Sequence, residues 1–235
     1  MDGDPELDLQ KLPLGYFCSA LNSPSQPVGS MGMQGGSLEK DREGVGLRDF
    51  LLIGGVAVAY FLAARWGLSL AFATQQVTAV WPPTGVALVA LLHFGYRAGF
   101  GIYLGALLAN ALANEPLGVA AGIALGNTLT GLGGCALLRK FIDFDPAIEK
   151  ARDVLALLGV AIVTPFLSAT GGVACLVLGG IVPQAAFGSV WRVWWMGDAL
   201  GILVYAPLLL TWIANPRFQW SGPKAYQRLF PALRS

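Results

Sequence analysis

The side chains that could do chemistry in this sequence are few, and the most informative of them interrupt long apolar runs. An ionisable or amide group inside such a run is costly to bury, so it usually faces the protein interior and is a candidate for function. Six residues meet this description: Arg65, Asn110, Asn114, Glu115, Arg192 and Asp198. They are predicted to contribute to a ligand- or signal-binding site.

The residue types do not support covalent catalysis or metal binding. The single histidine, His93, makes a Ser-His-Asp arrangement or a histidine-built metal site untenable, and the three cysteines lack metal-ligand spacing. The sequence has no P-loop, no GxGxxG following a strand and no HExxH motif. We therefore expect neither an enzyme nor a protein that carries a metal or a cofactor.

Two irregular helix entrances accompany the charged residues. They are AVWPPTG at residues 79–85 and VWRVWWMGDALG at residues 190–201, and both are placed on the outer side of the membrane by the topology given below. Together they could line one polar recess with Arg65 and Asp198 at its base. The residues of the predicted recess, besides the six named above, are Trp81, Pro82, Pro83, Gly85, Trp194 and Trp195.

Each of these features also has a purely structural explanation. Asp198 could pair with Arg65 or Arg192 only to hold the bundle together, and Trp-Pro-Pro could be only a helix start with an interfacial anchor. The asparagines could form hydrogen bonds that only hold helices together. The tryptophans could form an aromatic belt at the membrane interface instead of an aromatic cage for a cation. The residue pattern leaves these alternatives open.

The composition identifies the elements that must position these residues as membrane spans. The 235 residues are 55% hydrophobic and 12% charged, whereas soluble domains carry about 25% charged residues. The net charge of +1 provides no field for nucleic acid. Six apolar segments, at about 50–73, 84–94, 98–113, 116–138, 154–178 and 191–212, predict an all-α, polytopic transmembrane helix bundle.

The placement of basic residues predicts the orientation of this bundle in the cell membrane. With the N-terminus inside, 13 of the 15 lysines and arginines fall on the cytoplasmic side, so both termini are predicted to be cytoplasmic. Residues 1–48, rich in Gly, Pro, Ser and charge, read as a disordered arm. Residues 49–214 form the predicted bundle, and residues 215–235 form a basic tail.

Small residues predict how the spans pack, because close backbone approach drives helix association in lipid. Three spans carry them at four-residue spacing: Gly101 and Gly105, then Gly118, Gly122 and Gly126, then Gly197 and Gly201. Packing within the bundle is the favoured interpretation, and a homodimer is the alternative. Pro165 and Pro207 are predicted to kink the spans that contain them.

The two helix entrances resemble those of a known family, the bacterial membrane-associated sensor domain of the first MASE type. The matching positions are Trp81, Pro82, Pro83 and Gly85, then Gly105 and Asn110 in LGALLAN, then Trp194, Trp195, Gly197, Asp198, Gly201 and Pro207. The resemblance covers roughly residues 50–213. Such domains are usually described with about eight spans, whereas this sequence suggests six.

The resemblance implies a sensory input module for a cytoplasmic signalling enzyme. That enzyme would be of the diguanylate cyclase, phosphodiesterase or histidine kinase type, either fused to the chain or separate from it. A stimulus at the outer recess would shift the helix packing and so reach the output partner. The rival hypothesis is a small transporter or substrate-binding membrane subunit, since intramembrane charges also mark transport sites.

Overall fold

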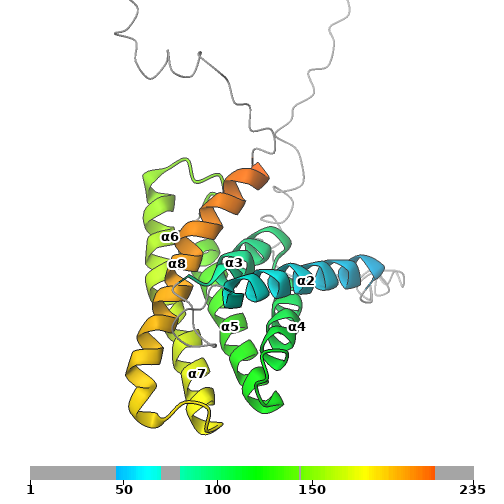
Figure 1. The fold of residues 1–235 in the computed structure, drawn as a ribbon. Coiled ribbons are helices and arrows are strands. Elements are labelled where there is room, and N and C mark those ends of the chain that lie inside the picture. Colours follow the sequence, from blue (N-terminus) through cyan, green and yellow to red (C-terminus); the bar gives the residue numbers. More distant parts are fainter. Residues whose placement is uncertain (1–45, 70–79, 143, 215–235) are drawn as a thin grey trace, which may run out of the picture. The chain divides into compact units, whose positions relative to one another are not determined.

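The computed structural model describes residues 46–69, 80–142 and 144–214, which belong to one compact unit and contain no strand. Seven α-helices follow in order: α2 (Leu47–Ser69), α3 (Pro82–Phe94), α4 (Ala98–Ala111), α5 (Leu117–Leu137), α6 (Ala151–Val163), α7 (Pro165–Leu178) and α8 (Phe187–Ala214). A π-helix, Leu138–Ile142, extends α5, and a short 3-10 helix, Gln184–Ala186, precedes α8 (Figure 1). The all-α prediction is confirmed, while the predicted N-terminal arm and the tail lie outside the described residues.

Helix length separates the predicted spans into two groups. Within the described ranges, four helical stretches are long and apolar enough to cross a membrane: Leu47–Ser69, Leu117–Ile142, Ala151–Leu178 and Gln184–Ile213. The helices α3 and α4 have only 13 and 14 residues, or about 20 Å each at 1.5 Å per residue. All six predicted segments are helical, but two of them are shorter than the roughly 30 Å of a hydrocarbon core.

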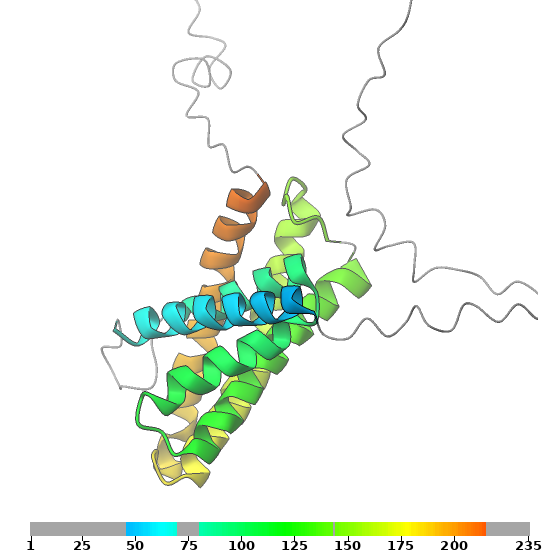
Figure 2. The ribbon, with the colours of Figure 1, turned by 90° about the vertical axis from the view of Figure 1, so that its right-hand side faces the viewer.

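The helices α2 and α4 lie side by side and run in the same direction, as Figure 2 shows. Glycines make this approach possible. A Cβ atom on Gly101 would come within 2.6 Å of the Ile53 carbonyl oxygen, and one on Gly105 within 2.5 Å of the Ala57 carbonyl oxygen. Because both contacts advance by four residues on both helices, the small-residue pair of α4 fits against the backbone of α2.

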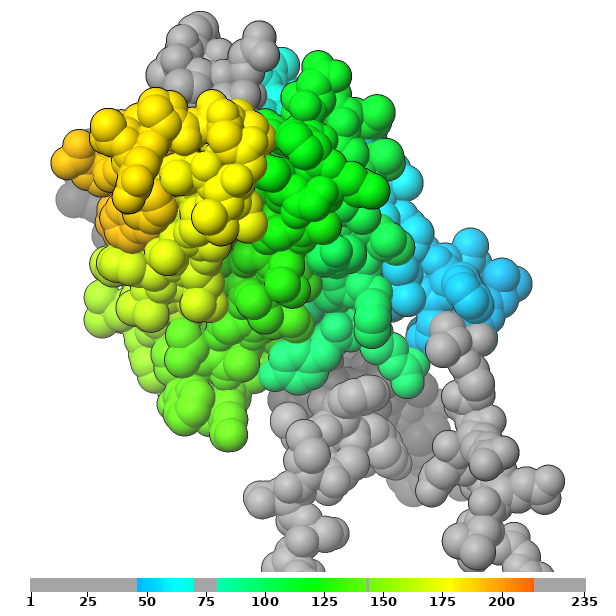
Figure 3. Space-filling view, turned by 90° about the horizontal axis from the view of Figure 1, so that it is seen from below, coloured from blue at the N-terminus to red at the C-terminus, as the bar shows by residue number. Residues whose placement is uncertain are grey.

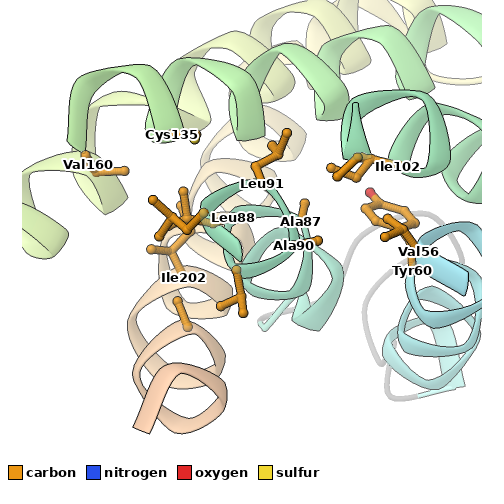
Figure 4. Packing of buried hydrophobic residues seen from close by; sticks show 14 of the residues in the cluster. Val56, Tyr60, Ala87, Leu88, Ala90, Leu91, Ile102, Cys135, Val160 and Ile202 are labelled. Carbon is orange, nitrogen blue, oxygen red and sulfur yellow. The ribbon is translucent and has the colours of Figure 1, made fainter. Parts of the chain in front are cut away.

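The short helix α3 lies in the middle of the core. Every residue from Ala87 to Leu92 is buried, and the helix packs against α2, α4, α5 and α8. In Figure 4, Leu88 of α3 lies near Ile202 of α8, and Tyr60 of α2 lies beside Ile102 of α4. An apolar helix surrounded on all sides needs no polar face, which explains why its sequence lacks amphipathic periodicity.

Pro165 interrupts the fifth predicted span, as expected for a residue that has no backbone N–H group. The helix α6 ends at Val163, Thr164 forms the break, and α7 begins at Pro165. Pro207, by contrast, lies inside α8, which continues to Ala214. The break in the α6–α7 span lies beside the buried polar residues described below.

Two connections between helices share one end of the bundle. The α4–α5 and α7–α8 connections lie at the same end (Figures 1 and 3). Two polar contacts are made around the α3–α4 connection: Arg97 forms an ion pair with Asp49 at 2.7 Å, and Arg139 donates a hydrogen bond to the Leu92 carbonyl oxygen at 2.5 Å. The first contact joins the start of α2 to the start of α4, and the second joins the end of α3 to the π-helix after α5.

Candidate functional site

Asp198 is the centre of a buried polar cluster in this bundle. It lies 11 residues after Phe187 in the 28-residue helix α8, or about 17 Å along its axis, and its side chain has no exposed surface. The sequence predicted a position at the outer start of a span beginning near Trp191. Because α8 begins four residues earlier than that, Asp198 lies near the middle of the helix.

Two hydroxyl groups from different helices form hydrogen bonds with the Asp198 carboxyl group. The Thr84 hydroxyl of α3 donates to Oδ1, and the Ser168 hydroxyl of α7 is hydrogen-bonded to Oδ2. The side chain of Trp194, one turn earlier in α8, also interacts with the carboxyl group. Each carboxyl oxygen therefore has a hydroxyl partner, which is the arrangement that a buried polar group requires.

The start of α3 is held against the middle of α8 by main-chain contacts. The Trp81 N–H donates to the Gly197 carbonyl oxygen at 2.8 Å. A Cβ atom on Gly85 would come within 2.5 Å of the Gly201 carbonyl oxygen, and one on Gly201 would overlap the carbonyl oxygen of Trp81. The first turn of α3 therefore lies beside the Asp198 carboxyl group, which Thr84 reaches with its hydroxyl.

Pro82 and Pro83 occupy the first two positions of α3 and are both buried. A proline fits there because the first N–H groups of a helix have no partner within the helix. The AVWPPTG motif therefore forms the start of a half-length helix inside the bundle. The sequence had placed this start at the outer membrane surface.

Thr130 of α5 connects the cluster to the break in the α6–α7 span. Its hydroxyl donates to the Thr164 carbonyl oxygen at 3.3 Å and accepts a hydrogen bond from the Ser168 N–H at 3.0 Å. In an uninterrupted helix these two backbone groups, four residues apart, would bond to each other. The Thr130 side chain is thus inserted into the backbone ladder of α7, a recognised cause of helix bending.

Two further buried polar atoms lie near this cluster. The Tyr60 hydroxyl of α2 and Oδ1 of Asn127 of α5 have no hydrogen-bond partner among the described residues. The side chains of Trp81 and Asn127 lie around that hydroxyl, and Tyr60 is close enough to Asp198 to interact with its charge. The polar cluster, defined here as Thr84, Thr130, Thr164, Ser168 and Asp198, therefore has two polar neighbours, Tyr60 and Asn127.

The tryptophans of α8 have separate roles. Trp194 is buried against Gly172 of α7, where an added Cβ would come within 2.6 Å of the indole ring. Trp191 and Trp195 stack in parallel with 6.4 Å between ring centroids, and both meet Phe166 edge-on. The Trp195 indole N–H donates to the Ile162 carbonyl oxygen at 2.9 Å, close to the helix break.

Replacement of Trp195 by Phe tests the contribution of this contact to the break. We expect Trp195→Phe to lower the free energy of unfolding by about 0.6 kcal/mol, the average for hydrogen bonds between helices in membrane proteins. Trp212→Phe, on an exposed side chain of the same helix, is the matched control and should have almost no effect. Equal losses in both variants, measured by unfolding in lipid nanodiscs, would contradict a specific role for the indole N–H.

The other predicted charged residues do not join Asp198. Arg65 and Arg192 are exposed, and no salt bridge to Asp198 occurs among the described residues. Glu115 is buried, but it lies before the start of α5, about 20 Å along that helix from Thr130. The Asn110 amide donates to the Ala106 carbonyl oxygen of its own helix at 2.8 Å, and Asn114 is exposed in a left-handed backbone conformation.

The glycines of α5 differ in their surroundings. Gly122 lies against the Cys175 sulfur of α7, and a Cβ atom on Gly126 would contact the Ser168 backbone at 3.4 Å. Gly118, grouped with them in the sequence, is in open space with no neighbour within 4 Å of such a Cβ. Gly122 and Gly126 therefore face α7, whereas Gly118 does not.

Sequence reasoning missed the hydroxyl residues as members of the site. Thr84 stands inside the AVWPPTG motif, and Thr164 and Ser168 flank Pro165 in the sequence. Hydroxyl side chains beside a proline in an apolar span are a usable signal, since they can satisfy the carbonyl groups that the proline leaves free. What the sequence did not reveal is that the hydroxyls of Thr84 and Ser168 contact an aspartate on another helix, whereas that of Thr164 donates to the Val160 carbonyl oxygen.

The fold and the polar cluster together define an integral membrane helix bundle with a polar interior. No group of three or more His, Cys, Asp or Glu side chains that could hold a metal ion occurs in the part of the chain that the structure describes. The cluster consists of hydroxyl groups and one carboxylate, a set suited to hydrogen bonding between helices.

Comparison with known proteins identifies the family. The MASE1 family model matches residues 53–235, which is most of the chain, so the chain belongs to the MASE1 family and contains a membrane-associated sensor domain. The family predicted from the sequence is thereby confirmed. No solved structure matches the chain.

The chain also matches part of a curated protein. The chain is 30% identical over 154 residues to the probable diguanylate cyclase DgcE of Escherichia coli (strain K12). The match covers 63% of this chain and only 13% of that protein. Because the chain spans so small a part of its relative, the cyclase activity in that name does not transfer to the residues described here.

Proposed function

We propose that this chain is a sensory input module whose helices adopt two alternative packings around the polar cluster. The observation that carries the proposal is the fully buried Asp198, hydrogen-bonded by hydroxyls of α3 and α7. A signal requires two states that differ in free energy of interaction with the stimulus. A cluster that joins α3, α5, α7 and α8 at one point is suited to that task, because repacking any one helix changes the hydrogen bonds of the others.

The position of α8 provides a route for the signal. The helix contains Asp198 near its middle and continues for 16 residues to Ala214, beyond which the basic tail lies outside the described residues. We propose that a change in the cluster moves the C-terminal half of α8 and acts on a cytoplasmic output. The diguanylate cyclase named among the relatives supports an output enzyme of that type, fused or separate.

The orientation of the bundle remains as the basic residues predict, with both termini in the cytoplasm. Two structural features support it. The helices α2 and α4 run in the same direction, and Asp49, Arg97 and Arg139 lie around the end where α3 joins α4. Six crossings would require α3 and α4 to span a thinned or partly solvated region, since each is about 20 Å long. The place of the stimulus is proposed to be the middle of the bundle and not an outer recess.

Asp198→Asn tests whether the cluster controls output. The chain would be joined after residue 235 to a diguanylate cyclase reporter, and the cyclic dinucleotide would be measured in cells grown under several conditions. Hydrogen bonds to a charged group contribute about 1.5–3 kcal/mol, so their loss in one of two packings should change basal output about tenfold or more. Glu149→Gln, on an exposed side chain, is the control and should behave as the wild type.

Membrane insertion must be measured in the same cells. Unchanged output from Asp198→Asn under every condition, with normal insertion, would mean that the carboxylate only holds the bundle together. The family assignment does not support the transporter hypothesis. Substrate uptake into proteoliposomes that contain the protein would support it.

A further inference from the structure

The hydroxyl of Ser168 contacts two acceptors but has only one hydrogen to donate. Its Oγ lies 3.1 Å from the Pro165 carbonyl oxygen and also within hydrogen-bonding distance of Oδ2 of Asp198. A serine hydroxyl can donate one hydrogen bond and accept others. One hydrogen can be shared between two acceptors, but each contact can be a full hydrogen bond if the carboxyl group supplies a hydrogen of its own.

From these contacts, the full burial of Asp198 and the absence of a salt bridge to it among the described residues, we infer that Asp198 is a proton-binding site. In it the protonated carboxyl group donates to Ser168, and Ser168 donates to the Pro165 carbonyl. The inference rests on the proposed function and names the ligand that acts on the cluster. A hydronium ion of the solvent transfers its proton to Oδ2 of Asp198, where an O–H bond forms, and a water molecule is left. Thr84 continues to donate to Oδ1 in both protonation states.

The protonation state sets the direction of the hydrogen bonds at the helix break. With Asp198 protonated, hydrogen bonds run from Asp198 to Ser168 and on to Pro165, the first residue of α7. With Asp198 ionised, the Ser168 hydrogen must turn toward the carboxylate and away from Pro165. The Thr130 hydroxyl already replaces the backbone hydrogen bond between Thr164 and Ser168. Few hydrogen bonds therefore hold the break in one geometry. Proton binding is thus coupled to the geometry of α7 relative to α8.

The charges around Asp198 are consistent with a proton as the ligand. It is fully buried, no cationic side chain is paired with it among the described residues, and a buried carboxylate without a cation is costly. Of the titratable groups on the packed elements, Tyr60 of α2 is the one that interacts with its charge. The other titratable or charged side chains on α3, α6, α7 and α8 are His93, Arg152, Asp153, Cys175, Arg192 and Tyr205.

A metal cation is a poorer ligand for this site. The carboxylate oxygens contact the Thr84 and Ser168 hydroxyls directly, so a cation could enter only by separating them. A proton needs no such space, because it lies within an existing contact. Sodium ions are therefore used as a competing ligand in the test.

Infrared difference spectroscopy on the full chain in lipid nanodiscs tests the inference. Between acidic and alkaline buffer we expect the carbonyl stretching band of a protonated carboxyl group to disappear. The band should be absent from Asp198→Asn and retained in Asp153→Asn, which alters another fully buried carboxyl group. Ser168→Ala removes the acceptor of the proposed hydrogen bond, so the band should remain with its frequency shifted upward.

The outcomes separate this inference from the proposed function. Absence of an Asp198-dependent band, or a band displaced by sodium at constant pH, would overturn the proton site while leaving the reporter test of Asp198→Asn unaffected. A pH-dependent band with reporter output that ignores Asp198→Asn would instead overturn the sensory role. If Asp198→Asn fails to fold, an unshifted band in Ser168→Ala is sufficient to reject the inference.

Discussion

Replacing Gly201 by Ala is expected to give the largest loss of stability of any single methyl addition in this bundle. The new Cβ would overlap the carbonyl oxygen of Trp81, and a backbone carbonyl at the start of a packed helix cannot rotate aside. Overpacking typically costs about 1–3 kcal/mol, and this site should lie at the upper end of that range. Thermal unfolding in nanodiscs measures it, at roughly 2–4 °C of Tm for each kcal/mol.

Gly118→Ala is the matched control for this substitution. It adds the same methyl group to a helix, but nothing lies within 4 Å of the new atom. Since alanine is the better helix former by about 1 kcal/mol, this variant should be unchanged or more stable. If Gly201→Ala and Gly118→Ala unfolded at the same temperature, the close approach of α3 to the middle of α8 would be incorrect.

The loss of stability at Gly201 has a functional meaning. Trp81, Gly85, Gly197 and Gly201 bring the first turn of α3 to the depth of Asp198, where Thr84 reaches the carboxylate. A methyl group that separates the two helices should therefore also break the hydrogen bond from Thr84. In the reporter fusion, Gly201→Ala should alter output in the same direction as Asp198→Asn.

Thr130→Val should produce the second large effect, by removing the hydroxyl inserted into α7 while keeping the side-chain shape. The buried Ser168 N–H would lose its partner, while the Thr164 carbonyl would still accept a hydrogen bond from the Leu167 N–H at 3.0 Å. A buried polar group left without a partner costs about 1–3 kcal/mol. We expect the variant either to lose that much stability or to regain a continuous helix in which Ser168 bonds to Thr164.

Thr128→Val distinguishes the inserted hydroxyl from threonine chemistry in general. Thr128 is buried on the same helix, but its hydroxyl donates to the Ala124 carbonyl oxygen of α5 itself at 2.7 Å. Its replacement should change stability by less than about 1 kcal/mol, since no backbone group on another helix is left unpaired. Amide hydrogen exchange at Ser168 reports which result Thr130→Val produces: faster exchange indicates an unpaired N–H, and slower exchange a straightened helix. Unchanged stability and unchanged exchange would contradict the insertion.

Both predictions concern the same small region. The effects on stability of substitutions in this region are therefore not expected to be independent. The hydrogen bonds of Thr84, Thr130 and Ser168 meet at Asp198 or at the break beside it. Residues in one hydrogen-bond network show coupled effects of about 0.5–3 kcal/mol. Combining Thr130→Val with Asp198→Asn should therefore give less than the sum of the separate losses.

The sequence by itself determined the class of this protein. The low charge content, the apolar runs and the two helix entrances identified a helical membrane bundle of the MASE1 type, because lipid leaves the backbone no alternative to internally bonded helices. It also located the break at Pro165, since a residue without an N–H group cannot continue the ladder. The sequence also identified Asp198 as a candidate site residue, because it is a carboxylate within an apolar segment.

Only the tertiary structure decided which groups meet that carboxylate and at what depth. Arg65 and Arg192 have the opposite charge to Asp198, so the sequence made them natural partners, yet both are exposed, and Thr84 and Ser168 bind the carboxylate instead. The reason is the close approach of α3 to α8, which depends on Gly85 and Gly201 facing each other across 116 positions of the chain. Residue spacing along one helix shows which face carries a polar group, but the register between two helices is set by how their surfaces pack.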